Sequence, residues 1–198
     1  MNELQEAIRV LKAGGVVVFP TETSYGIGCD ATNAKAVRRV FRLKGRPHGK
    51  GTPLIVSSLA MAKRYGLFSK TALDLAKKHW PGALTLAVPV LGTSLSDVPN
   101  LIIQHKTIAM RVSSHPIARA LARGLGRPIV ATSANRSGEP PAFQITDLPH
   151  WKDVFVLDAG RLPKAPPSTL VRVVGDTLEV LRPGSIKISR MGLLETRP

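Results

Sequence analysis

Short apolar segments alternate with segments of helical period along most of this chain, and this alternation limits the fold more than any other feature. Apolar stretches this short are typical of strands covered on both faces. The segments between them place apolar residues three and four positions apart, which is typical of helices with one buried face. Strands are expected at 16–19, 54–56, 84–88, 107–112, 128–131, 154–157, 169–174 and 178–181, and helices at 2–13, 33–43, 58–65, 69–80, 116–123 and after 184.

Strands that alternate with helices predict an α/β fold, and Gly175-Asp176 between the last two strands predicts a hairpin. Together they predict a twisted mixed β-sheet with flanking helices. The chain has 198 residues, which fits a single domain over 1–198, because domains commonly have roughly 100–200 residues.

The charge of the chain is strongly positive. It has 28 Lys and Arg against 13 Asp and Glu, a formal net charge of +15. This excess predicts an anionic partner such as a nucleotide or nucleic acid. No apolar stretch approaches the roughly 18 residues of a membrane span, and the first residues have mixed charge, unlike a secretory signal. With Cys29 as its single cysteine, the chain is expected in the reducing cytoplasm and away from membranes.

Several standard motifs are nearly present and are rejected. The sequence at 26–31 fits G-x-G-x-x-A, but a polar loop separates it from the preceding strand and no acid follows before Asp74. The sequence at 45–50 is one residue short of a P-loop, and Gly51 replaces its hydroxyl residue. The histidines and Cys29 have no metal-ligand spacing. We therefore expect no metal site and no redox or organic cofactor.

The polar loops share one composition of hydroxyl groups, small residues and isolated cations. They lie at 20–26, 44–47, 132–138, 168–169 and 181–184. Hydroxyl groups and Asn suit an amino acid and a nucleoside, whereas Arg and Lys suit carboxylate and phosphate groups. Only two acids, Glu22 and Asp158, are expected in these loops, so general acid–base catalysis has few candidates. The pattern favours positioning and charge stabilisation, as in phosphoryl and nucleotidyl transfer.

Seven motifs occur in the order found in one protein family. They are PTETSYGIG at 20–28, KGRP at 44–47 with PLIV at 53–56, WPGALTL at 80–86, AMRV at 109–112 followed by HP, TSANRSGEP at 132–140, STLV at 168–171 and LRPG at 181–184. The chain thereby resembles the YrdC-like L-threonylcarbamoyladenylate synthases (TsaC) over about residues 5–188. Its length is similar to that of the short, single-domain form.

The resemblance implies a YrdC/RibB-type fold with a deep basic pocket. It implies synthesis of threonylcarbamoyl-AMP and pyrophosphate from L-threonine, bicarbonate and ATP, with Mg2+ arriving on ATP. That product serves the N6-threonylcarbamoyl modification of adenosine 37 in tRNA, so tRNA or double-stranded RNA and the proteins that use the product are expected partners.

The family pattern also implies site residues. Catalysis is expected from Lys44 and Arg46, ATP binding from Arg46, Thr52, Thr107, Asn135 and Arg182, and L-threonine binding from Thr23, Ser57, Arg111, Ser133 and Ser168. No metal-ligating residue is implied.

The sequence departs from the family pattern at three points. The loop that includes His48-Gly49-Lys50-Gly51-Thr52 is lengthened, which leaves the position of Thr52 open. Ser57 stands where the family often has a histidine that contacts threonine. After the SGEP turn, Pro141-Ala142-Phe143 replaces hydroxyl residues, so a nucleotide contact there would involve only the backbone.

Two other functions remain as alternatives. One is a basic RNA-binding protein of the same fold without catalysis; the charge favours it, but aromatic residues are few and no RNP-type stacking motif is present. The other is a carbamoyl transfer like that of hydrogenase maturation proteins, whose acylphosphatase and zinc-finger segments have no counterpart in this sequence.

Overall fold

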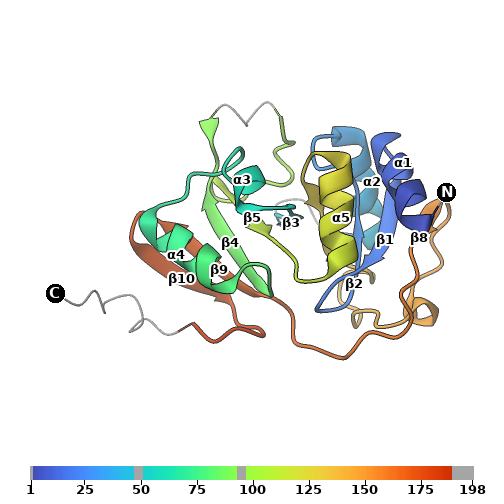
Figure 1. Cartoon of the computed structure of the whole chain (residues 1–198). Helices are drawn as coiled ribbons and strands as arrows, with labels where there is room; N and C mark the ends of the chain where they lie inside the picture. Colours follow the sequence, from blue (N-terminus) through green and yellow to red (C-terminus); the bar gives the residue numbers. More distant parts are fainter. Residues whose placement is uncertain (1, 47–50, 93–96, 189–198) are drawn as a thin grey trace.

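The computed structural model describes residues 2–46, 51–92 and 97–188, which form two β-sheets with helices packed around them (Figure 1). The helices are α1 (Glu3–Lys12), α2 (Ala34–Lys44), α3 (Leu59–Ala62), α4 (Lys70–His79), α5 (Pro116–Leu125) and the 3-10 turn at Ile145–Asp147. The strands are β1 (Val16–Pro20), β2 (Tyr25–Gly28), β3 (Leu54–Ile55), β4 (Leu84–Pro89), β5 (Thr107–Arg111), β6 (Ile129–Val130), β7 (Thr132–Ser133), β8 (Val154–Val156), β9 (Thr169–Val174) and β10 (Thr177–Arg182).

Both sheets combine parallel and antiparallel pairs, which confirms the expected mixed α/β class. The four-stranded sheet has the order β7-β2-β1-β8, with β1 antiparallel to β2 and parallel to β8. The six-stranded sheet has the order β10-β9-β4-β5-β3-β6, with β4 parallel to β9 and antiparallel to β5. The strands thus divide between two sheets, where the sequence predicted one.

The two sheets meet where β2 passes β6. Asp30, just beyond β2, forms an isolated bridge with Ile129. At Gly28 an added Cβ would lie 1.8 Å from the carbonyl oxygen of Val130, so only glycine fits this crossing. The ends of strands from both sheets are therefore brought to one region of the molecule.

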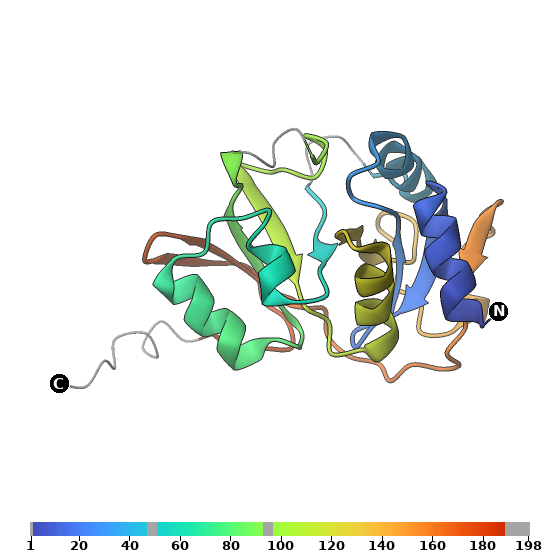
Figure 2. The same cartoon turned by 45° about the horizontal axis from the view of Figure 1, so that its top comes forward.

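The helices gather in two groups. Figures 1 and 2 show α1, α2 and α5 around the four-stranded sheet, and α3 and α4 on one side of the six-stranded sheet. Helix α1 packs on α5, and a core cluster that includes Leu11, Phe19 and Leu121 fills the space beneath them. Asn2 caps α1 through its side chain, as its position before the apolar stripe predicts.

Three local expectations were wrong. Residues 25–28, where no strand was expected, form β2, because antiparallel pairing with both β1 and β7 outweighs the two glycines in this stretch. Helix α5 ends at Gly126, with φ 74°, and not at Gly124. Gly124 lies inside the helix, where an added Cβ would lie 2.4 Å from Cδ1 of Ile8. The expected terminal helix is absent over 183–188, and the rest of that segment, 189–198, lies outside the described residues.

Among the described residues, no helix combines the length and the apolar character needed to cross a membrane.

Candidate functional site

A cavity of about 360 Å³ lies where the loops of the two sheets converge. The β1–β2 loop, the end of β5, the segment around β7 and the segment before β9 all contribute to its wall. Most of the site residues implied by the resemblance line this cavity, although they come from distant parts of the sequence. Those that do are Thr23, Arg46, Arg111, Ser133, Asn135, Ser168 and Arg182.

Three arginines share the cavity wall. Arg182 donates from Nη2 to the carbonyl oxygen (2.8 Å) and to Oγ (3.0 Å) of Ser168, which fixes its guanidinium beside the start of β9. Burial lowers the pKa of Arg182, and the nearby charges of Arg111 and Arg46 lower it further. Like charges held this close repel one another until an anion lies between them. The cavity is therefore suited to a ligand with several negative charges.

Lys44 lies behind the cavity wall and does not line it. It is 3% exposed, and its Nζ donates to the carbonyl oxygens of Ser133 (2.5 Å) and Asn135 (2.7 Å) and to Asn135 Oδ1 (3.4 Å). Its own carbonyl oxygen accepts from the backbone N–H of Ser137 (2.8 Å). Burial, with a smaller effect of Arg46, lowers the pKa of Lys44 to about 8. In this structure Lys44 holds the loop after β7 and does not line the cavity, although a catalytic role was expected for it.

Asn135 is held by its own loop as well as by Lys44. Its Nδ2 donates to the carbonyl oxygens of Arg136 (2.8 Å) and Glu139 (2.6 Å). Both ends of the amide are thus engaged, and the loop that carries Ser133 and Asn135 is fixed at the cavity wall.

The β1–β2 loop is tied in the same way. Thr21 Oγ1 donates to the carbonyl oxygen of Ser24 (2.7 Å) and lies 3.0 Å from Thr23 Oγ1. Between these hydroxyl residues, the Glu22 carboxylate accepts hydrogen bonds from Arg111 Nη1 and from Ser113 Oγ. Arg111 is 7% exposed, so this acid balances a buried cation.

A wider groove of about 880 Å³ adjoins the cavity over the six-stranded sheet. Arg46, Pro53 and Arg182 line both spaces. Thr107 lines only the groove, and its Oγ1 donates to the carbonyl oxygen of Gln104 (2.7 Å). An elongated ligand could therefore extend from the cavity into the groove past the two shared arginines.

Two other implied residues lie outside both spaces. Thr52 is buried, and its Oγ1 has no hydrogen-bond partner among the described residues. Ser57 is half-buried and lies 3.7 Å from the sulfur of Met61, so the structure gives no sign of a ligand contact there. Residues 48–50 of the lengthened loop lie outside the described residues.

Other lining residues were not singled out from the sequence. Thr21 and Ser24 flank Thr23 in the PTET motif, so the motif itself was the signal. Glu139 also lines the cavity, and it was missed because it lies one residue beyond the predicted polar loop at 132–138. Pro141 is the one residue of the altered Pro141-Ala142-Phe143 segment that lines the cavity.

The residues described in the structure contain no group of three or more His, Cys, Asp or Glu that could hold a metal ion.

Comparison with known proteins gives consistent matches. Residues 9–184 match the family model Sua5_yciO_yrdC, described as "Telomere recombination". The threonylcarbamoyl-AMP synthase of Bacillus subtilis (strain 168) is 37% identical over 190 residues, and that of Thiobacillus denitrificans (strain ATCC 25259 / T1) is 44% identical over 133 residues. The structure of P. abyssi Sua5 complexed with L-threonine is 32% identical and superposes with a TM-score of 0.85.

These matches differ in how much of each protein they cover. The B. subtilis match covers 93% of this chain and 54% of that protein, so the chain spans about half the length of this relative. The T. denitrificans match covers 67% of this chain and 69% of that protein. The P. abyssi structure covers 93% of this chain, which corresponds to 55% of the larger protein.

Proposed function

The chain belongs to the Sua5/YciO/YrdC family, and we propose that it is a nucleotidyltransferase that makes threonylcarbamoyl-AMP and pyrophosphate from ATP, L-threonine and bicarbonate. The observation that supports this most strongly is the cavity wall. Residues from six separate segments, which the family pattern assigns to threonine and ATP, line one space of about 360 Å³. The arginines found there suit a mechanism that positions the substrates and neutralises their charges.

The proposed reaction needs little proton transfer by the protein. The amine of threonine takes up CO2 derived from bicarbonate and gives an N-carboxylate. A carboxylate oxygen then attacks the α-phosphorus of ATP, and the bond to the leaving pyrophosphate breaks. Because the attacking group is already an anion, no strong general base is required. The main barrier is bringing two anions together, which cationic side chains reduce.

We assign the substrates to the two adjoining spaces. Thr23, Ser133 and Ser168 offer hydroxyl groups in the cavity near Arg111, which suits a hydroxylated amino acid with a carboxylate. Arg46 and Arg182, at the junction with the groove, would bind the phosphates. Thr107 lies on the groove side and would contact the nucleoside, as would Asn135 from the cavity side.

Thr52, Ser57 and Mg2+ have no place in this assignment of residues to the cavity and the groove. Thr52 and Ser57 would reach the substrates only if the neighbouring backbone shifts on binding. Mg2+ would be carried by the triphosphate of ATP, because the described residues offer it no carboxylate cluster. The charge neutralisation derived above therefore rests on the arginines.

The decisive assay combines the protein with ATP, L-threonine and bicarbonate and measures pyrophosphate, with mass analysis of the adenylate. We expect pyrophosphate release to require both threonine and bicarbonate, because the nucleophile forms from these two. If ATP turnover persists when either is omitted, the proposed reaction is wrong.

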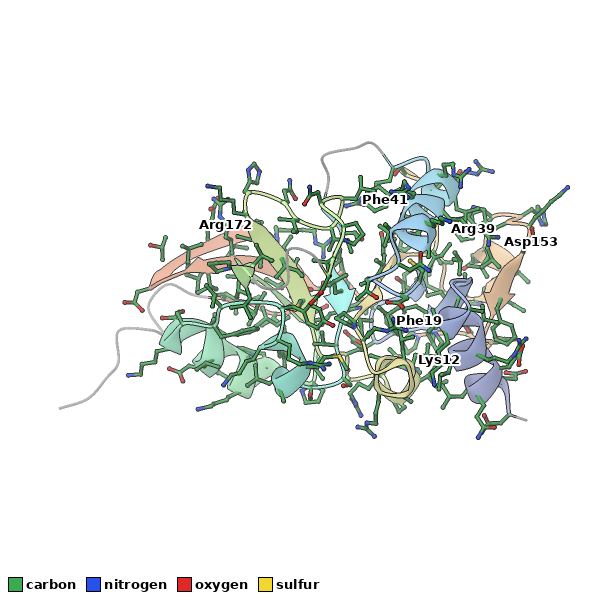
Figure 3. The ribbon with its side chains drawn as sticks, turned by 90° about the horizontal axis from the view of Figure 1, so that it is seen from above. Lys12, Phe19, Arg39, Phe41, Asp153 and Arg172 are labelled. Carbon is green, nitrogen blue, oxygen red and sulfur yellow. The ribbon has the colours of Figure 1, made fainter. Side chains whose placement is uncertain are left out.

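We further propose that the product serves tRNA modification in the cytoplasm and that RNA contacts the outer face of α2. A surface groove of about 720 Å³ is lined by Lys35, Arg38, Arg42 and Arg46 beside Phe41. Figure 3 shows Phe41 on the side of α2 away from Arg39, which points toward Asp153 and donates to its carbonyl oxygen (2.8 Å). Regularly spaced cations on one helix suit a phosphate backbone.

The double substitution Arg38→Ala/Arg42→Ala should weaken binding of double-stranded RNA. Each lost phosphate contact is expected to reduce the slope of log K against log salt by about 0.7–0.9. Filter binding at several salt concentrations measures this slope. Arg123→Ala, which removes an exposed cation on α5, is the matched control. Pyrophosphate release should stay unchanged in these variants, and an unchanged salt slope in the double variant would exclude this face.

A further inference from the structure

Glu22 lies between two residues of the cavity wall but does not itself line the cavity. Thr21 and Thr23 line it on either side, whereas the Glu22 side chain is 14% exposed and directed at β5 and the residues that follow it. One carboxylate oxygen accepts from Arg111 Nη1 and the other from Ser113 Oγ. Glu22 therefore contacts Arg111 without lining the cavity itself.

The far side of this contact is anchored to helix α5. Ser113 Oγ accepts from the backbone N–H of His115 (3.1 Å), and the Ser113 carbonyl oxygen accepts from Arg119 Nη1 (2.8 Å). The hydroxyl group of Ser113 is thereby oriented toward Glu22. A continuous chain of hydrogen bonds runs from α5 through Ser113 and Glu22 to Arg111, which restricts the orientation of the guanidinium.

Arg111 depends on this acid. Burial lowers the pKa of Arg111, whereas the charge of Glu22 and its hydrogen bond raise it. Within the described part of the chain, Glu22 is the acceptor assigned to Arg111, and it engages only Nη1. The guanidinium has other N–H donors besides Nη1, and Arg111 lines the cavity.

The acid also makes Arg111 electrostatically different from Arg182. The pair of Glu22 and Arg111 has no net charge. Arg182 instead donates to Ser168 and has no carboxylate partner among the described residues. A neutral but polarised pair suits a zwitterionic amino acid, whereas uncompensated arginines attract phosphates.

We propose that Glu22 is a positioning and specificity-determining residue that presents Arg111 to the carboxylate of the amino-acid substrate and, by compensating the charge of Arg111, disfavours the binding of phosphates to this arginine. This inference rests on the proposed function, since it assumes that an amino acid and a nucleotide share the cavity. It assigns a role to Glu22, an acid that would contact neither substrate.

The test is calorimetric titration of L-threonine, and separately of inorganic pyrophosphate, into wild-type protein and Glu22→Gln. The amide keeps the size of the side chain and removes its charge. We expect about a 10-fold weaker threonine affinity and tighter pyrophosphate binding, so that pyrophosphate begins to compete with threonine. Asp74→Asn, which neutralises an exposed carboxylate on α4, should change neither value.

Ser113→Ala separates orientation from charge. It removes one hydrogen bond of Glu22 and keeps its charge, so threonine affinity should fall while pyrophosphate affinity stays constant. If the ratio of the two dissociation constants is unchanged in Glu22→Gln, the inference is wrong. If Glu22→Gln does not fold, as judged by thermal melting, unchanged threonine affinity in Ser113→Ala overturns it instead. Wild-type protein that binds neither threonine nor ATP would contradict the proposed function itself, which is a distinguishable outcome.

Discussion

Replacing Arg46 by alanine should reduce pyrophosphate release by about 10²- to 10³-fold, the usual effect of removing one electrostatic contact from a closed site. Arg46 lines the 360 Å³ cavity and the adjoining groove, so phosphates that pass between the two spaces must meet it. Its Nη2 donates to the carbonyl oxygen of Gly51 (2.5 Å), and its guanidinium lies 5.9 Å from the centre of the Phe41 ring. These contacts hold the charge at the junction of the cavity and the groove without a bound ligand.

The loss should appear mainly in kcat, because the charge that develops on the leaving pyrophosphate is greatest in the transition state. Arg46→Lys keeps the charge without the planar fork and should recover only part of the rate. Arg123→Ala is the matched control for loss of one positive charge elsewhere on the protein. Near-normal pyrophosphate release by Arg46→Ala would exclude this residue from the reaction.

The starts of helices α2, α3 and α4 followed from local sequence. Asn33 caps α2, Ser58 caps α3 and Ser69 caps α4, each through its side-chain oxygen, and the predicted helices begin at these three residues. Caps and apolar periodicity act within a few residues, so a single sequence contains the information.

The division into two sheets did not follow from the sequence, because it depends on contacts between distant strands. Tyr25–Gly28 looks like a loop by composition, yet Gly28 is required where Val130 crosses closely. Similarly, Gly124 resembles a helix end until α1 is placed against α5, where Ile8 occupies the space of a side chain. In both cases the glycine serves a neighbour far away in sequence, which local propensity cannot reveal.

The motifs predicted most of the implied residues that line the cavity. They did not predict the hydrogen bonds and ion pairs that hold these residues in place. The pairing of Glu22 with Arg111 joins residues 89 positions apart, and nothing in either motif specifies it. The position of Lys44 could have been found. Val37, Val40 and Phe41 form the buried stripe of α2, and Lys44 continues it at the next turn, so helical period alone predicts a buried lysine.

Lys44→Met should lower pyrophosphate release by about 100-fold, although Lys44 does not line the cavity. Its ammonium group has three donors, which match three acceptors in the loop that carries Ser133 and Asn135. Methionine has similar length and no donor, so the loop loses its anchor. A misplacement of about 1 Å in a positioning group costs on the order of 10²-fold in rate.

The pH dependence tests this role of Lys44 directly. With a pKa lowered to about 8, Lys44 is protonated below pH 8 and loses a proton as the pH rises through that value. The neutral amine has only two donors for three acceptors, so the loop is held less firmly and activity should fall. Threonine itself becomes more reactive at high pH, because its amine loses a proton, which would mask this fall.

The ratio of wild-type to Lys44→Met activity removes that complication, since the threonine amine affects both proteins equally. We expect the ratio to be constant below pH 8 and to decline above it. Lys44→Arg keeps its charge across this range, so the ratio of its activity to that of Lys44→Met should not decline. A ratio of wild-type to Lys44→Met activity that stays constant up to pH 10 would show that the proton on Lys44 does not hold the loop.

If Lys44→Met is as active as wild type, the ammonium group is not needed as an anchor. The loop that carries Ser133 and Asn135 must then be fixed by its own hydrogen bonds to Arg136 and Glu139.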